Sequence, residues 1–235
     1  KQDFDAVLIG IGAWVSTGVG CPGEDSEGVI GGIDFLRKVV RNEYIDLGEK
    51  VAIVGGGNTA MDACRTAVRL GAKEVYNIYR RTKDEMPADM VEIEEAEEEG
   101  VIFKNLTNPI EVVADENGRV KEVVLQVMEL GEADASGRRR PVPVEGKTET
   151  IKVDTMILAI GQAVDASKFD DLDKTKKGAI AYDKDTFMTS MEGVFAGGDC
   201  GNDKISIAVE AIADAKKVSE SIDAYLNGEV LKYEK

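Results

Sequence analysis

The sequence contains no histidine, and this absence removes several kinds of chemistry. Without an imidazole, the chain has no histidine general base, no Ser-His or Cys-His nucleophile pair and no histidine metal ligand. Only three cysteines are present, Cys21, Cys64 and Cys200, and they form no C-x-x-C pair. We therefore expect no metal, iron–sulfur or dithiol site built from this chain's own residues. Widely spaced free cysteines suit a reducing compartment, so we expect the cytoplasm.

The sequence also lacks an apolar run long enough to span a membrane. Basic residues are outnumbered, 29 against 45, and the net charge of −16 disfavours nucleic acid and anionic membranes as partners. Residues 1–5 do not resemble a signal peptide, and they lack an initiator methionine, as in a processed chain or a piece of a longer one. The 235 residues, 43% of them hydrophobic, suit one large soluble domain or two small ones.

The most informative stretch is residues 51–62, in which four apolar residues lead into a glycine turn and then a helix. Gly55, Gly57 and Ala60 match the G-x-G-x-x-G/A pattern of dinucleotide-binding units. Gly55 allows a tight turn, Gly57 lets a pyrophosphate approach the backbone, and Ala60 lets the helix pack closely on the strand. Free N–H groups and the positive dipole end of the helix would face the phosphates. The alternative is a plain glycine-rich turn.

A strand–helix–strand unit surrounds this turn. The helix beginning at Asn58 has small apolar side chains at helical spacing, and Gly71 is expected to follow its last residue. Residues 75–79 predict the next strand, with a right-handed crossover. Residues 84–99 include nine acidic side chains and predict a helix whose acidic face meets solvent or, alternatively, a partner; residues 101–103 predict a further strand.

The middle of the chain changes character. Residues 110–114 and 120–130 predict a β-hairpin whose turn lies at residues 117–118. The polar stretch 131–149 is expected to form a loop. Its basic triplet, residues 138–140, is interpreted either as part of a mobile loop or as a phosphate site.

Two similar apolar strands flank the glycine-rich segment. In residues 5–12 and 154–161, an aspartate begins a strand that ends at a glycine seven residues later. We interpret them as similarly placed crossover strands. This predicts an α/β protein in which residues 40–158 form one domain, inserted into a second domain made of residues 1–39 and 159–235.

The last third of the chain contains a second motif. Residues 189–199 read as a turn, a short apolar strand and a Gly-Gly-Asp exit that ends at Asp199. Residues 205–226 predict a closing helix, and Cys200 is expected to be a packing residue. Taken alone, Asp199 has the alternative of being an ordinary turn or helix-capping residue.

Together these segments resemble the two-dinucleotide-domain flavin oxidoreductases, and specifically the small (beta) subunit of NADPH-dependent glutamate synthase. The N-terminal flavin region of dihydropyrimidine dehydrogenase and the NADP-linked ferredoxin oxidoreductases are relatives. The resemblance covers nearly the whole chain and depends on residues 55–62, 79–81, 86–88, 98–100, 159–162 and 193–199. It implies a Rossmann-like NAD(P)-binding domain, with a parallel sheet and a β-hairpin, inserted in a partial FAD-binding domain of the FAD/NAD(P) disulfide-reductase-like type.

The cofactor prediction follows from matched positions. NAD sites usually place an acidic residue at the end of the second strand, for the ribose 2′-OH. Here that strand ends in Arg80 and Arg81, whose guanidiniums suit the 2′-phosphate of NADPH, unless they are simply solvated. Asn58 and Thr59 are expected to bond phosphate or nicotinamide-side groups. The resemblance further places Gly161 and Gln162 beside the nicotinamide.

The resemblance also assigns FAD contacts in the last third of the chain. Gly198 and Asp199 belong to the FAD motif, with Asp199 accepting hydrogen bonds from the ribityl chain. The backbone of Ser206, Ile207 and Ala208 would face the isoalloxazine. The family's glycine motif for the ADP half of FAD is expected upstream of residue 1, so the FAD site in this chain is incomplete.

The implied function is that of an NADPH-dependent flavin oxidoreductase. NADPH would pass a hydride to FAD, and electrons would continue to iron–sulfur centres in an upstream region of the same polypeptide or in a large partner subunit. No side chain is assigned a catalytic role. Two alternatives stay open: a non-catalytic NADP(H)-binding module, or another flavin reductase of the ferredoxin:NADP or dihydropyrimidine dehydrogenase type. The absence of C-x-x-C argues against a thioredoxin-reductase-like enzyme.

The incomplete FAD site yields a prediction for the isolated chain. The purified chain should bind NADPH but retain FAD weakly or not at all, as measured by absorbance of the purified protein and NADPH titration. Stoichiometric FAD surviving purification would show that the site is more complete than expected. A yellow protein that oxidises NADPH with an artificial acceptor would contradict the non-catalytic alternative.

Overall fold

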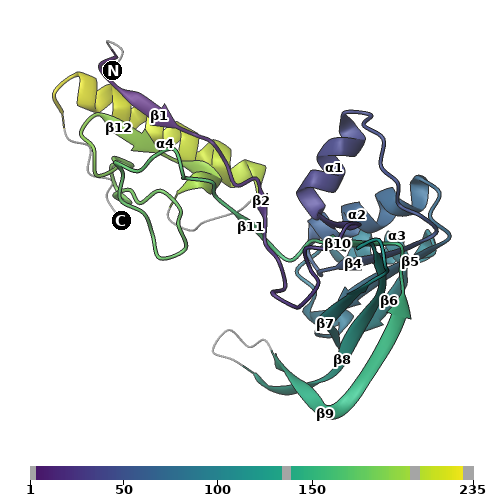
Figure 1. The fold of residues 1–235 in the computed structure, drawn as a ribbon. Coiled ribbons are helices and arrows are strands. Elements are labelled where there is room, and N and C mark those ends of the chain that lie inside the picture. Colours follow the sequence, from purple (N-terminus) through teal and green to yellow (C-terminus); the bar gives the residue numbers. More distant parts are fainter. Residues whose placement is uncertain (1–3, 134–138, 202–206, 230–235) are drawn as a thin grey trace. The chain divides into compact units, whose positions relative to one another are not determined.

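The computed structural model describes residues 4–133, 139–201 and 207–229, and it divides the chain into two compact units (Figure 1). Unit 2 is one continuous segment, Ser16–Gly161, and unit 1 combines Lys1–Val15 with Gln162–Lys235. Residues 16–39, which the sequence analysis grouped with the flanking domain, thus belong to unit 2. The reason is the strand β3 (Val29–Gly31), which pairs in parallel with β10 (Thr155–Leu158) of that unit.

A parallel five-stranded sheet forms the centre of unit 2, in the order β3-β10-β4-β5-β6. Its other strands are β4 (Lys50–Val54), β5 (Glu74–Tyr79) and β6 (Ile102–Asn105). The predicted parallel sheet is therefore confirmed. Because side chains alternate along a strand, β4 contributes buried side chains to both faces of the sheet. Val51 and Ile53 belong to one buried cluster, and Ala52 and Val54 belong to another.

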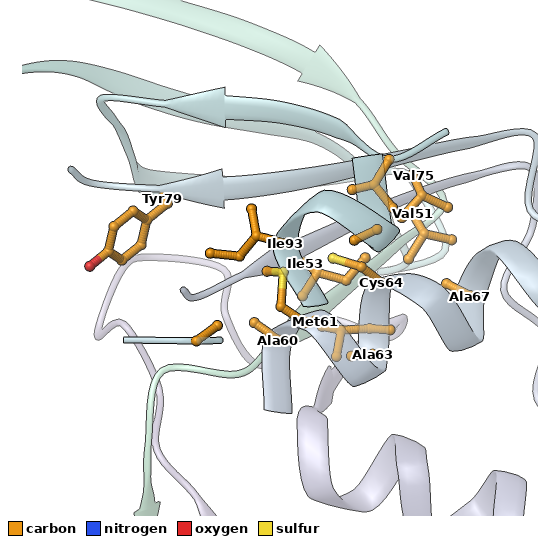
Figure 2. Packing of buried hydrophobic residues seen from close by; sticks show 14 of the residues in the cluster. Val51, Ile53, Ala60, Met61, Ala63, Cys64, Ala67, Val75, Tyr79 and Ile93 are labelled. Atoms are coloured by element: carbon orange, nitrogen blue, oxygen red, sulfur yellow. The ribbon is translucent and has the colours of Figure 1, made fainter. Parts of the chain in front are cut away.

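Three helices cover one face of this sheet: α1 (Gly32–Val40), α2 (Asn58–Arg69) and α3 (Met90–Glu98). They place Phe35, Met61 and Ile93, all essentially inaccessible to solvent, in the same cluster as Ile53 of the central strand. Figure 2 shows how the small side chains of α2 lie directly against the strands. Small residues at these positions let helix and sheet approach closely.

The opposite face is covered by an antiparallel sheet of β7 (Thr107–Ala114), β8 (Val120–Ala133) and β9 (Arg139–Lys152) (Figure 1). Val123 and Leu125 of β8 are fully buried against the central sheet. The hairpin prediction is confirmed, but the expected loop over 131–149 is wrong at both ends, because residues 131–133 belong to β8 and residues 139–149 belong to β9. Residues 134–138 lie outside the described part of the chain. β9 is a largely exposed edge strand, so polar residues occupy both of its faces and no apolar alternation marks it.

The acidic segment that follows β5 is helical only in its second half. Residues 83–85 form a short 3₁₀ turn with a capping box between Thr82 and Glu85, and the Asp89 carboxylate then caps α3 by accepting from Val91 N at 3.0 Å. Part of the acidic face is paired within the unit, because the Arg65 guanidinium of α2 lies 2.6 Å from a Glu95 oxygen and 2.8 Å from a Glu99 oxygen.

Unit 1 contains a parallel pair, β1 (Val7–Ile9) with β12 (Val194–Ala196), and the helix α4 (Ala208–Leu226). Val218 of α4 packs against Phe195 of β12 in a buried cluster. A 3₁₀ turn (Gly198–Cys200) follows β12, and the short strands β2 (Val15–Ser16) and β11 (Gln162–Ala163) pair where the chain passes between units. The two strands that look alike in sequence thus take different places, β1 in unit 1 and β10 within the sheet of unit 2.

Within the described ranges, no helix combines the length and the apolar character needed to cross a membrane.

The burial of β8 predicts that the hairpin and the parallel sheet unfold together. Leu125→Ala should lower the free energy of unfolding of unit 2 by about 3 kcal/mol, because the change leaves a cavity in the core between the two sheets. Urea denaturation followed by circular dichroism measures this value. The control is Ile110→Ala on β7, where the side chain is 39% exposed and the expected loss is under about 1 kcal/mol. Equal losses would contradict the packing described.

Candidate functional site

The candidate site lies at the carboxyl ends of β4, β5 and β10. Along the chain, β5 and β6 follow β4 on one side of the sheet, whereas β10 pairs with β4 on the other. The strand order therefore reverses between β4 and β10. In open parallel sheets, ligands bind in the crevice outside the strand ends at such a reversal point.

Gly55 makes the tight turn after β4, and the structure gives two reasons for a glycine there. Its φ of +145° is a conformation that side chains disfavour, and a Cβ atom at this position would lie 2.2 Å from the Ala159 carbonyl oxygen. The neighbouring backbone is fixed by hydrogen bonds from Gly55 N to Ile78 O (3.0 Å) and from Ala159 N to Val54 O (2.8 Å). The turn is thus held between the two neighbouring strands.

Gly57 and Ala60 also fit the geometry expected of them. Around Gly57, a Cβ atom would have only Pro87 Cγ within 4 Å, at 3.9 Å, so this side of the turn is open. Gly57 is the N-cap of α2 and has no side-chain oxygen, so no side chain caps the first helical turn. Of its N–H groups, Ala60 N donates to Gly57 O at 2.8 Å. Ala60 is fully buried, and its Cβ faces Gly55.

The loop after β5 folds back onto the glycine turn, a feature that the sequence did not indicate. A Cβ atom on Gly56 would lie 2.5 Å from the Tyr79 ring, and the Tyr79 hydroxyl donates to Glu85 O at 2.9 Å. Ala88 N in turn donates to Gly56 O at 3.1 Å. Aromatic packing and backbone hydrogen bonds therefore hold residues 80–89 over the turn.

Asn58 and Thr59 begin α2 beside this loop. The exposed Asn58 side chain accepts a hydrogen bond at Oδ1 from Asp89 N (3.2 Å), which leaves its Nδ2 group as a donor. Thr59 is half-buried, and its Cγ2 lies 3.3 Å from where a Cβ of Gly32 would stand, at the start of α1. Both residues thus lie at the start of α2, at the carboxyl edge of the sheet, as the dinucleotide-binding pattern predicts.

Arg80 and Arg81 follow the last residue of β5. Arg80 is exposed, and its guanidinium has no hydrogen bond or ion pair with any residue that the structure describes. Arg81 is half-buried, and its Nε donates to the Arg139 carbonyl oxygen of β9 at 2.8 Å. The seven residues from the glycine pattern and the strand end, Gly55, Gly57, Asn58, Thr59, Ala60, Arg80 and Arg81, all lie at one edge of unit 2.

The other predicted residues are distributed along both units. Gly161, with φ +152°, ends unit 2 beyond β10 and accepts from Thr17 N at 3.1 Å; Gln162 is half-buried and starts the second part of unit 1. Gly198 and the half-buried Asp199 lie in the 3₁₀ turn after β12. At the start of α4, Ile207 is 60% exposed and Ala208 is exposed, whereas Ser206 lies outside the described residues.

Asn77 is a site residue that sequence reasoning missed. It is fully buried in β5, and its Nδ2 donates to Gly55 O at 2.9 Å and lies 3.7 Å from Cys64 Sγ. Its Oδ1 is buried with no partner in the described part of the chain, so the amide is held by its donor side alone. The available signal was an amide residue inside an otherwise apolar strand, since buried polar groups need partners.

The cysteines show no sign of activation. Burial raises the pKa of the Cys64 thiol to about 12, and burial together with the Glu24 charge raises the pKa of Cys21. The Cys200 thiol lies 3.3 Å from both Ile9 O and Gly197 O, as expected of a packing residue. No cluster of acidic and cysteine side chains suited to a metal ion occurs among residues 4–133, 139–201 and 207–229.

The bond from Asn77 to the glycine turn yields a prediction. Asn77→Ala should lower the free energy of unfolding by about 2 kcal/mol, because the Gly55 carbonyl loses its buried side-chain donor. The matched control is Thr155→Val in β10, because the buried Thr155 hydroxyl has no partner in the described structure. That change should leave stability unchanged or raise it. Urea unfolding compares the two, and equal destabilisation would contradict the role given to Asn77.

Comparison with known proteins places this geometry in a family. The family model for pyridine nucleotide-disulphide oxidoreductases matches residues 1–215. The NADP(+)-dependent formate dehydrogenase subunit beta of Moorella thermoacetica is 46% identical, over 96% of this chain and 32% of that protein. The NADPH-Fe(3+) oxidoreductase subunit beta of Geobacter sulfurreducens is 42% identical, over 96% and 37%. The glutamate synthase [NADPH] small chain of Escherichia coli is 35% identical, over 96% and 51%. This chain therefore spans about a third to a half of these relatives.

Solved structures agree on the fold. FprA of Mycobacterium tuberculosis, determined in complex with NADPH, matches with a TM-score of 0.78 at 17% identity, over 98% of this chain and 67% of that chain. Thioredoxin reductase of T. acidophilum matches with a TM-score of 0.71 at 19% identity, over 94% and 66%. These likenesses confirm the predicted FAD/NAD(P) disulfide-reductase-like fold. The family match over residues 1–215 shows that the chain belongs to the pyridine nucleotide-disulphide oxidoreductase family.

Proposed function

We propose that unit 2 binds NADPH and that the chain is the NADPH-binding part of a flavin oxidoreductase. In the whole protein, hydride would pass from NADPH to FAD and electrons would continue to iron–sulfur centres, as in the glutamate synthase small subunit. The observation that carries the proposal is the open glycine turn at the start of α2, with two arginines at the end of the next strand.

The glycine turn fits a pyrophosphate. A dinucleotide phosphate needs backbone N–H donors, a positive dipole end and no side chain in its way. The first turn of α2 has uncapped N–H groups, and only Pro87 Cγ comes near the free side of Gly57. Asn58 Nδ2 is a further donor at this edge. The bond from Asn77 to Gly55 O holds the turn in shape before any ligand arrives.

The two arginines favour NADPH over NADH. A 2′-phosphate presents two negative charges and several acceptor oxygens, which guanidinium groups bind through paired hydrogen bonds. Arg80 is exposed and Arg81 is oriented by its bond to Arg139 O. The names of the relatives from Moorella, Geobacter and Escherichia all include NADP or NADPH, which supports the same cofactor here.

The flavin assignment concerns unit 1. Bound FAD would accept the hydride and release electrons one at a time. The chain's own contribution would be the turn at Gly198 and Asp199 and the start of α4 at Ile207 and Ala208, with Ser206 before it, while Gly161 and Gln162 would border the nicotinamide. An upstream region of the same polypeptide, or a large partner subunit, would complete the FAD site and hold the iron–sulfur centres. Three unpaired cysteines support a cytoplasmic location.

A second candidate is that the isolated chain is a non-catalytic NADP(H)-binding module. It is favoured by the chain spanning only 32–51% of the three relatives. The names of those relatives differ in the second substrate. A third candidate is therefore that the whole protein is a flavin reductase other than a glutamate synthase subunit, of the ferredoxin:NADP or dihydropyrimidine dehydrogenase type.

The 2′-phosphate assignment is tested by removing both guanidiniums. Arg80→Ala combined with Arg81→Ala should weaken NADPH binding roughly a hundredfold, about tenfold for each charged contact, and should weaken NADH binding far less. Fluorescence titration with both nucleotides measures the difference.

The control removes the same charge from the helix that follows the edge strand β3. Arg37→Ala on α1 with Arg41→Ala at its C-cap, both exposed, should leave both affinities within about twofold, because solvent screens distant charges. Equal loss of NADPH and NADH binding in the Arg80 and Arg81 variant would refute the assignment.

A further inference from the structure

We propose that Arg139 of β9 is a specificity-determining residue that contributes a third guanidinium to the NADPH 2′-phosphate site, alongside Arg80 and Arg81. The proposal rests on the proposed function and deepens it. It also decides between the two interpretations of the basic triplet at 138–140, in favour of a phosphate contact for its second member. Arg138 lies outside the described residues and takes no part.

The antiparallel sheet brings β9 back to the end of β5. Leu106 N donates to Arg81 O at 3.0 Å, and Met128 N of β8 donates to Leu106 O at 2.7 Å. β9 pairs along β8, and Arg139 stands opposite Ala133. The final link is direct, since Arg81 Nε donates to the Arg139 carbonyl oxygen at 2.8 Å. Two residues 58 positions apart in the sequence are therefore neighbours.

The Arg139 guanidinium is oriented although it is exposed. Its Nε donates to Gly131 O at 3.0 Å and its Nη2 donates to Leu130 O at 2.7 Å. A guanidinium has five N–H donors, so these two bonds leave donors available for an anion. Exposed arginine side chains ordinarily lose rotamer freedom when they bind, and a side chain that is already oriented loses less.

The Arg139 and Arg81 charges both act on the same carboxylate, that of Glu85. The carboxyl of Glu85, in the loop over the glycine turn, has a lowered pKa. The largest cause is a hydrogen bond from the Thr82 hydroxyl, and the Arg139 and Arg81 charges add to it. Two like charges near one carboxylate repel each other, and a dianionic phosphate between them would relieve that repulsion.

Arg140, the next residue of β9, supplies a matched control. Successive side chains of a strand point to opposite faces, so Arg140 faces away from Arg139. It is exposed, and its guanidinium has no hydrogen bond or ion pair with the described residues. Arg139→Gln and Arg140→Gln therefore remove the same charge from adjacent positions, and only the first removes the proposed contact.

The test compares affinities of the full chain for NADPH and NADH. Arg139→Gln should weaken NADPH binding about tenfold and leave NADH binding within about twofold, and Arg139→Lys should give an intermediate loss because it keeps the charge without the paired donors. Arg140→Gln should leave both affinities unchanged. Thermal unfolding of each variant identifies any general loss of structure, which would lower NADPH and NADH binding together.

The outcomes separate this inference from the proposed function. If the unaltered chain prefers NADPH and Arg80 and Arg81 account for the preference, but Arg139→Gln behaves like Arg140→Gln, Arg139 is not part of the site and only the present inference is overturned. An equal loss of NADPH and NADH binding in Arg139→Gln overturns it as well. If the unaltered chain binds neither nucleotide, the proposed function is overturned together with it.

Discussion

The close contact between Gly55 and the Ala159 carbonyl is the constraint on which the rest of unit 2 depends. It requires a glycine after β4, and it places β10 directly beside that strand. The glycine turn therefore lies where the strand order reverses, and α2 begins at that point. The same turn accounts for two further residues. Ala60 is small enough to pack against Gly55, and the Asn77 amide fixes the Gly55 carbonyl by donating a hydrogen bond to it.

The charge distribution explains why the arginines matter. The chain has a net charge of −16, so its overall field opposes an anionic dinucleotide. A local concentration of guanidiniums at the end of β5 and the start of β9 offsets this field where a phosphate would be held. Glu85 balances the same group when no ligand is bound, because its carboxylate is kept ionised by Thr82 and the nearby arginines. Selectivity for a 2′-phosphate would thus be a local property of an acidic molecule.

Features determined by local sequence could be predicted, and those determined by tertiary pairing could not. The apolar run before Gly55 and the small residues of α2 reflect burial directly, so the turn and its flanking elements were recognised. β9 was missed because an exposed edge strand needs no apolar pattern. The boundary at Ser16 and the roles of Asn77 and Arg139 depend on partners far along the chain. Propensity and spacing contain no information on such contacts.

The division of the chain has a consequence for the order of synthesis. All strands of unit 2 lie within one continuous segment, whereas β1 pairs with β12, and Val7 faces Val194 from nearly the other end of the chain. Domains complete on the ribosome can fold while later residues are still being added. Unit 2 would then be finished first, and β1 would gain its pairing with β12 only after the whole of unit 2 had been made.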